Sequence, residues 1–170
     1  MSFDRDEVEA SFRKLWQTGA VGEDWDAQAD LYTPDADYFD HFYGRMTMDE
    51  FRVWCNDLMS VRFPELYTAY EWHVVDGARV VVHMQNRRDN PEPGAPPIDF
   101  PSVTIYQYAG DGLWCADTDY WSMLRAVEAR RTYEAAAARF DPDHLLLRSR
   151  AHWPASPDWA HPPTARSADA

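Results

Sequence analysis

The sequence has 170 residues, enough for one domain that buries about 70% of its unfolded surface. Its net charge of −13 argues against binding to nucleic acid or to an anionic membrane surface, because both require a basic patch. No apolar run approaches the length of about 18 residues that a membrane-spanning helix needs, and no signal peptide opens the chain. Cys55 and Cys115 lack CxxC spacing. We therefore expect a cytoplasmic protein with reduced thiols.

Two helices and a short strand are predicted in the first quarter of the chain. Asp4 followed three residues later by Glu7 is typical of a helix N-terminus, and Gly19 is a natural C-terminal cap. The apolar residues at helical spacing between them are Val8, Phe12, Leu15 and Trp16. A second helix is expected over residues 24–32, and an aromatic strand over residues 38–43.

The third predicted helix has the clearest local signal. Thr47 and Glu50 have the spacing of a capping box, and Met46 can pack on Phe51 as a hydrophobic staple. The apolar stripe that follows consists of Phe51, Trp54, Cys55, Leu58 and Met59. We therefore expect a helix that buries one face.

The middle of the chain has the pattern of a β-hairpin followed by a loop. Strands are predicted over residues 67–75 and 79–88, joined at the Asp-Gly dipeptide of residues 76–77. Residues 89–97 are too rich in proline to pair within a sheet, so we expect a loop there.

A second hairpin is predicted over residues 103–108 and 113–120, with Gly-Asp-Gly in the turn. Side chains alternate across a strand, so one face of its second strand should carry Cys115, Asp117, Asp119 and Trp121. The opposite face should carry Trp114, Ala116, Thr118 and Tyr120. Two carboxylates and an indole on one face of an apolar strand indicate the wall of a pocket.

Helices and strands are segregated along the chain, which predicts the α+β class. We expect a curved antiparallel sheet with three N-terminal helices on its concave face, a tapering cavity between them, and a C-terminal helix over residues 122–140. Residues 1–140 form the expected domain. Residues 141–170 form a proline-rich tail that either packs on the surface or on a partner, or is disordered.

Several stretches resemble the nuclear transport factor 2-like superfamily, and its SnoaL-like branch most closely. They are EDWDAQADLYTPDADYFD, TMDEF, FPELYTAYEWHVVDGARVVVHMQNR and FPSVTIYQYAGDGLWCADTDYWSMLRA. The resemblance covers about residues 5–128. It implies a cone-shaped fold, a homodimer packed through the outer face of the sheet, and a cavity that the superfamily uses for unrelated reactions.

Compared with the ketosteroid isomerases of this superfamily, the resemblance places Asp40 at the position of the carboxylate base. The tyrosine acid of those enzymes corresponds to Trp16 here, and their neutral aspartic acid corresponds to Thr104. The strong oxyanion donors are therefore replaced, which argues against ordinary steroid isomerisation.

Compared with the epoxide hydrolases and cyclases, Asp119 lies near the position of a catalytic aspartate. The arginine and second aspartate of the hydrolase correspond here to Met84 and Asn86, so that triad is incomplete. The resemblance therefore implies neither the complete isomerase mechanism nor the complete epoxide hydrolase mechanism for this protein.

The residues themselves suggest acid–base chemistry. A carboxylate in an apolar cavity has its pKa raised by desolvation, which suits it to proton transfer near neutral pH. Asp40 and Asp119 are the candidate catalytic residues, although Asp40 has the structural alternative of capping a turn or pairing with an arginine. The candidate substrate-binding residues are Trp16, Tyr38, Asn86, Thr104, Tyr106, Asp117 and Trp121.

No histidine or cysteine spacing is typical of a metal site, and no glycine-rich phosphate loop is visible, so no metal or cofactor is expected. The favoured function is a cofactor-independent lyase, isomerase or cyclase. Its ligand would be a hydrophobic small molecule such as a polycyclic, polyketide-like or steroid-like compound. The alternative is a non-catalytic module that binds a small molecule or dimerises, and a third hypothesis makes the tail a docking arm for a larger enzyme.

Overall fold

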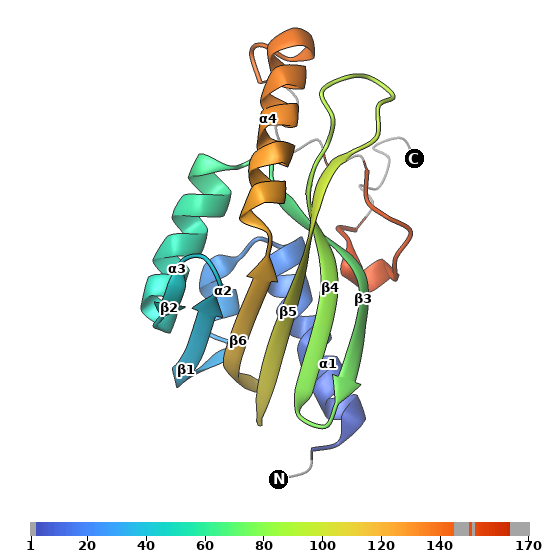
Figure 1. Cartoon of the computed structure of the whole chain (residues 1–170). Helices are drawn as coiled ribbons and strands as arrows, with labels where there is room; N and C mark the ends of the chain where they lie inside the picture. Colours follow the sequence, from blue (N-terminus) through green and yellow to red (C-terminus); the bar gives the residue numbers. More distant parts are fainter. Residues whose placement is uncertain (1–2, 145–149, 151, 164–170) are drawn as a thin grey trace, which may run out of the picture.

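The structure, a computed structural model, describes residues 3–144, 150 and 152–163 (Figure 1). The helices are α1 (Arg5–Trp16), α2 (Trp25–Ala29), α3 (Met48–Asp57) and α4 (Met123–Phe140). The strands are β1 (Tyr32–Asp40), β2 (Gly44–Met46), β3 (Tyr67–Asp76), β4 (Arg79–Arg88), β5 (Ile98–Gly110) and β6 (Leu113–Trp121). Short turns of π-helix extend α1 over Gln17–Val21 and α3 over Leu58–Arg62.

The predicted α+β class and curved sheet are confirmed. The six strands are arranged in the order β2-β1-β6-β5-β4-β3. One feature of the prediction is wrong: the sheet is not purely antiparallel, because β1 pairs with β6 in parallel. β1 enters the sheet from the helical region and not through a hairpin with β6, so no tight turn forces the two strands to run in opposite directions.

The three N-terminal helices lie on the concave face of the sheet, as predicted (Figure 1). Aromatic contacts join the two layers, with the Phe51 ring 4.5 Å from that of Tyr38 and the Trp16 ring 5.6 Å from that of Tyr70. A second apolar cluster lies at one end of the sheet, where Tyr133 of α4 packs with residues at the start of β5. α4 therefore packs against the end of the sheet where β5 begins.

The capping signals have the predicted geometry. The Asp4 carboxylate accepts a hydrogen bond from the backbone N–H of Asp6 at 2.8 Å, and Thr47 and Glu50 form a complete capping box. Ser122 caps α4 by accepting a hydrogen bond from the N–H of Arg125.

The predicted second helix is too long and the predicted first strand starts too late. α2 ends at Ala29, and β1 already begins at Tyr32. Pro34 explains part of the difference, since the residue before a proline is driven towards extended backbone. Tyr32 also pairs in register with Trp114 of β6, a tertiary contact that local sequence does not reveal.

Gly19 does not end the first helix, as the sequence predicted, but lies inside its π-helical turn. A Cβ atom at Gly19 would stand 2.2 Å from Oε1 of Gln28. The glycine is therefore needed for the close approach of α2, and the chain leaves the helix at Gly22.

Both hairpins and the proline-rich loop are confirmed, and β5 starts at Ile98, five residues earlier than predicted. The strict alternation predicted for β6 is wrong at one point. Gln107 pairs with Ala116 and Tyr108 pairs with Trp114, so Cys115 is the extra residue of a β-bulge. Trp114 consequently turns into the core, where it is fully buried, and Cys115 leaves the face that carries Asp117.

The described part of the C-terminal tail packs on the protein itself, one of the alternatives left open by the sequence. The ring of Trp153 lies 5.1 Å from that of Tyr67, and the buried carbonyl of Ala160 accepts a hydrogen bond from the Trp16 indole. Arg150 forms an ion pair with Glu23. The remaining tail positions, 145–149, 151 and 164–170, lie outside the described residues.

Within the described ranges, no helix has both the length and the apolar character required to cross a membrane.

Candidate active site

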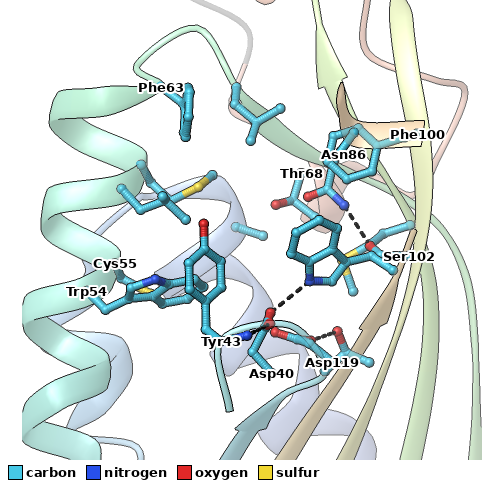
Figure 2. Close-up of a pocket in the computed structure, with 18 of the residues that line it drawn as sticks. Asp40, Tyr43, Trp54, Cys55, Phe63, Thr68, Asn86, Phe100, Ser102 and Asp119 are labelled. Carbon is cyan, nitrogen blue, oxygen red and sulfur yellow. Dashed lines mark hydrogen bonds between the residues drawn. The ribbon is translucent and has the colours of Figure 1, made fainter. Parts of the chain in front are cut away.

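A cavity of about 320 Å³ lies between the helices and the concave face of the sheet (Figure 2). All nine residues that the sequence predicted as catalytic or substrate-binding border it. They are Trp16, Tyr38, Asp40, Asn86, Thr104, Tyr106, Asp117, Asp119 and Trp121. Aromatic and aliphatic side chains from α3, β4, β5 and α4 complete the wall, among them Phe51, Leu58, Met59, Phe63, Met84 and Phe100.

Two carboxyl groups on β6 lie at one end of this cavity. Asp117 and Asp119 are separated by one residue and therefore point to the same face, with Cα atoms about 7 Å apart. Asp119 accepts hydrogen bonds from the hydroxyls of Tyr38, at 2.7 Å, and of Thr104. Asp117 accepts one from the Tyr32 hydroxyl at 2.6 Å.

The two carboxyl groups have different surroundings, and these raise their pKa values to different extents. Desolvation raises the pKa of Asp119 to about 6, while the hydrogen bonds from Thr104 and Tyr38 limit the rise. Desolvation and the neighbouring Asp119 raise the pKa of Asp117 well above its ordinary range. With a pKa of about 6, Asp119 is mostly ionised at neutral pH, and its negative charge favours the protonated form of Asp117. Oδ1 of Asp117 has no hydrogen-bond partner among the described residues.

Asp40 is placed beside this pair but has a different set of contacts. It pairs with Asp119 across β1 and β6, so the two side chains are neighbours. One oxygen of Asp40 accepts hydrogen bonds from the backbone N–H groups of Phe42 and Tyr43, both at 2.7 Å, and the other accepts one from the Trp121 indole at 2.8 Å (Figure 2). Asp40 thus caps the turn between β1 and β2 and fixes an indole in the cavity wall.

Two of the predicted substrate-binding residues already donate hydrogen bonds within the protein. The Trp16 indole donates to the Ala160 carbonyl at 3.3 Å, and the Asn86 amide donates to the Ser102 hydroxyl at 2.9 Å (Figure 2). Their remaining surfaces border the cavity. Tyr106 is buried next to Thr104, and burial raises the pKa of its hydroxyl.

Sequence reasoning missed several polar residues in or beside the cavity. Among them are Trp25, Gln28, Tyr32, Trp54, Arg88 and Arg130. The indole nitrogens of Trp25 and Trp54 are buried and lack a hydrogen-bond partner within the described part of the chain. Trp54 was assigned to the core because it lies on an apolar helical stripe. A usable signal existed for Arg88, since it follows Met84 and Asn86 at intervals of two along one strand face.

The curved sheet, its helical cover and the cavity between them define the cone-shaped fold of the nuclear transport factor 2-like superfamily. Within that superfamily the family is also established, because the model of the SnoaL-like domain matches residues 8–116. The chain belongs to the SnoaL-like family, as the sequence resemblance indicated. No protein with curated annotation is matched.

Solved structures of the same fold are similar to this chain at low sequence identity. A SnoaL-like polyketide cyclase from Jannaschia sp. CCS1 is 22% identical, with a TM-score of 0.57 over 75% of this chain and 96% of that one. A ketosteroid isomerase-like protein from Catenulispora acidiphila, in complex with trimethylamine, is 20% identical, with a TM-score of 0.54 over 74% and 90% of the two chains. An epoxide hydrolase-like protein from M. tuberculosis is 15% identical, with a TM-score of 0.57 over 78% and 96%.

Proposed function

We propose that this protein catalyses a cofactor-independent acid–base reaction, of the lyase, isomerase or cyclase type, on a hydrophobic small molecule. The observation that carries the proposal is the carboxyl pair of Asp117 and Asp119 at one end of an otherwise largely aromatic and aliphatic cavity. Two titratable groups whose pKa values are driven apart by their surroundings are suited to act as acid and base together.

In this proposal Asp119 is the base and Asp117 is the acid. The Asp119 carboxylate removes a proton from a carbon next to a substrate carbonyl, and the electron pair moves onto the carbonyl oxygen as an enolate. When a carbon–carbon double bond of the substrate is conjugated with the enolate, the protonated Asp117 delivers its proton to the far carbon of that double bond. The electron pair of the enolate then re-forms the carbonyl group and shifts the double bond. The proton gained by Asp119 returns to Asp117, so the enzyme regains its starting state without an external reactant.

Hydrogen-bond donors for the enolate oxygen come from α3 in this scheme. The Trp54 ring lies 5.9 Å from that of Tyr38, whose hydroxyl is bound to Asp119, and its indole N–H is among the buried donors that lack a partner in the described chain. An oriented donor of this kind stabilises charge that develops in the transition state. Tyr38 and Thr104 hold the Asp119 carboxylate in place.

Asp40 was predicted as a catalytic carboxylate, and we propose a positioning role for it instead. Both of its oxygens already accept hydrogen bonds, three in all. Its position next to Asp119 raises the pKa of that group by charge repulsion. Asp40 therefore tunes the base and orients Trp121.

The experiment measures proton exchange on a generic bicyclic ketone. The protein is incubated with 2-tetralone in D2O, and loss of the C1 proton signal is followed by NMR. We expect exchange above the buffer rate, a decrease of about 100-fold or more for Asp119→Asn, and unchanged tetralone affinity. Asp111→Asn, in the exposed turn between β5 and β6, is the matched control. Binding of tetralone without any exchange would reject catalysis and support the alternative of a binding module.

We also propose a homodimer formed through the outer face of the sheet. Trp72, His83, Val103 and Tyr120 pair in register across β3, β4, β5 and β6 and form one row on that face. Trp72 and Tyr120 of this row are 48% and 44% exposed, and a partner sheet packed on this face would cover both rings. Sedimentation velocity should show a dimer that Trp72→Glu converts to a monomer, while Val53→Glu, on the exposed side of α3, leaves the dimer intact.

A further inference from the structure

The end of the cavity opposite the carboxyl pair contains a buried arginine. Phe63 borders this end, away from Asp40 and Asp119 (Figure 2). Arg88, the last residue of β4, also borders the cavity and is only 3% exposed. Its Nε donates to Oε1 of Glu65 at 2.9 Å, whereas its Nη1 is buried and has no hydrogen-bond partner in residues 3–144, 150 and 152–163.

Burying a guanidinium N–H group without a hydrogen-bond acceptor destabilises the protein unless a ligand supplies that acceptor. Arginine carries five N–H donors in a fixed plane, and leaving one buried without an acceptor loses its hydration with no compensation. The group is nevertheless held firmly, because the rings of Phe63 and Tyr133 each lie 5.7 Å from its central carbon. The free donor is therefore pre-oriented and is not a mobile surface charge.

A second arginine lies close to the first. Arg130 of α4 borders the same cavity, and its guanidinium carbon lies 5.2 Å from the Phe63 ring. The acidic groups nearby are engaged: Glu65 with Arg88 at 2.9 Å, and Glu134 with Arg130 at 2.6 Å. Asp141, which is buried near Tyr133, has an interaction of its own.

We propose that Arg88 binds a carboxylate group on the ligand, through Nη1, with Arg130 contributing a second positive charge at the cavity mouth. Hydrogen bonds between a guanidinium and a carboxylate are charge-assisted and roughly twice as strong as those between neutral groups. The inference rests on the proposed function and refines it: the ligand is an amphipathic acid with its carboxylate at Arg88 and its reacting carbon at Asp119.

The spacing of the two ends sets the length of such a ligand. Thr104 of β5 pairs in register with Asp119 of β6 and with Val82 of β4. Val82 and Asp119 therefore lie at the same height in the sheet. Arg88 is six residues further along the same strand, which corresponds to about 20 Å of backbone. The two groups therefore lie at different levels of the sheet, which requires an elongated ligand.

The test compares an acid with its uncharged ester. Binding of 4-(2-naphthyl)butanoate and of its methyl ester is measured by isothermal titration calorimetry. We expect the acid to bind at least about 10-fold more tightly than the ester, a difference that a charged hydrogen bond readily supplies. Because Arg88→Met alone would leave Glu65 buried without its partner, the test variant is the double substitution Arg88→Met with Glu65→Gln.

The double variant should bind acid and ester about equally, and Arg130→Gln should lose part of the preference. Arg125→Met is the matched control on α4, since Arg125 pairs with Glu128 on the exposed side and does not border the cavity. Equal affinity of the wild-type protein for acid and ester, or an unchanged preference in the folded double variant, would overturn the proposal. Asp119→Asn should keep the preference, so a failure of the catalytic proposal remains distinguishable.

Discussion

Replacing Asp119 with Asn should remove a large pH-dependent penalty on folding. The pKa of Asp119 is raised from its ordinary value of 3.8 to about 6 in the folded protein, mainly by desolvation. Between these two values the folded state holds more protons than the unfolded state, so the free energy of unfolding falls as pH rises. The stability that Asp119 contributes when protonated is lost as the pH passes from about 4 to above 6.

The magnitude follows from the same two values. Integrating the difference in bound protons from pH 4 to pH 7.5 gives about 2 kcal/mol, an upper figure because the carboxyl group borders a cavity. Asn cannot ionise, so the variant does not lose this stability as the pH rises. Removing the Asp119 charge also lowers the raised pKa of Asp117. This second effect also makes the variant more stable relative to the wild type as the pH rises.

The measurement is urea denaturation of both proteins at several values between pH 4 and pH 7.5. The free energy of unfolding of Asp119→Asn minus that of the wild type should increase by about 2 kcal/mol across this range. Hydrogen bonds lost from Tyr38 and Thr104 add an offset that does not depend on pH. Asp111→Asn, which removes a carboxylate from an exposed turn, should show a nearly flat difference. A flat or decreasing difference for Asp119→Asn would refute the placement of an ionisable carboxyl in the cavity.

Three further substitutions test contacts that position the site. Tyr32→Phe removes the donor to Asp117 and should destabilise the protein by about 1–2 kcal/mol in urea denaturation; no change would mean that the hydrogen bond is absent. Gly19→Ala should cost about 1–3 kcal/mol, because its Cβ would collide with Gln28, and Gln28→Ala in the same chain should restore most of the loss. Trp159→Ala should lower the free energy of unfolding by about 2 kcal/mol, since its ring packs at 6.0 Å from Phe12 and 5.1 Å from Tyr70; an unaffected midpoint would show that the tail does not pack there.

The fold was predictable where local signals and tertiary contacts agree. The capping box at Thr47 and the Asp-Gly turn at residues 76–77 specify their structures within a few residues, and both are present. The second helix was predicted too long because Tyr32 continues the apolar spacing of that helix, while its true partner Trp114 is 82 residues away. Local spacing carries no information about such a pairing.

The candidate site was predictable in outline because side chains alternate along a strand. Asp117, Asp119 and Trp121 are close enough in sequence for that rule to place them on one face, and all three border the cavity. What the rule could not supply was the bulge at Cys115, which carries no glycine or proline as a marker.

The bulge has a direct consequence for the chemistry of the site. By shifting the alternation it turns Trp114 inward, where its ring lies 5.6 Å from that of Tyr106. With the regular alternation, that indole would face outward, away from the core. Tyr106 pairs in register with Asp117, so the buried Trp114 ring adds to the apolar surroundings of a carboxyl group that is only 3% exposed. Desolvation is the largest cause of the raised pKa of Asp117. An irregularity in strand pairing thus contributes to the burial that raises the pKa of one of the two carboxyl groups.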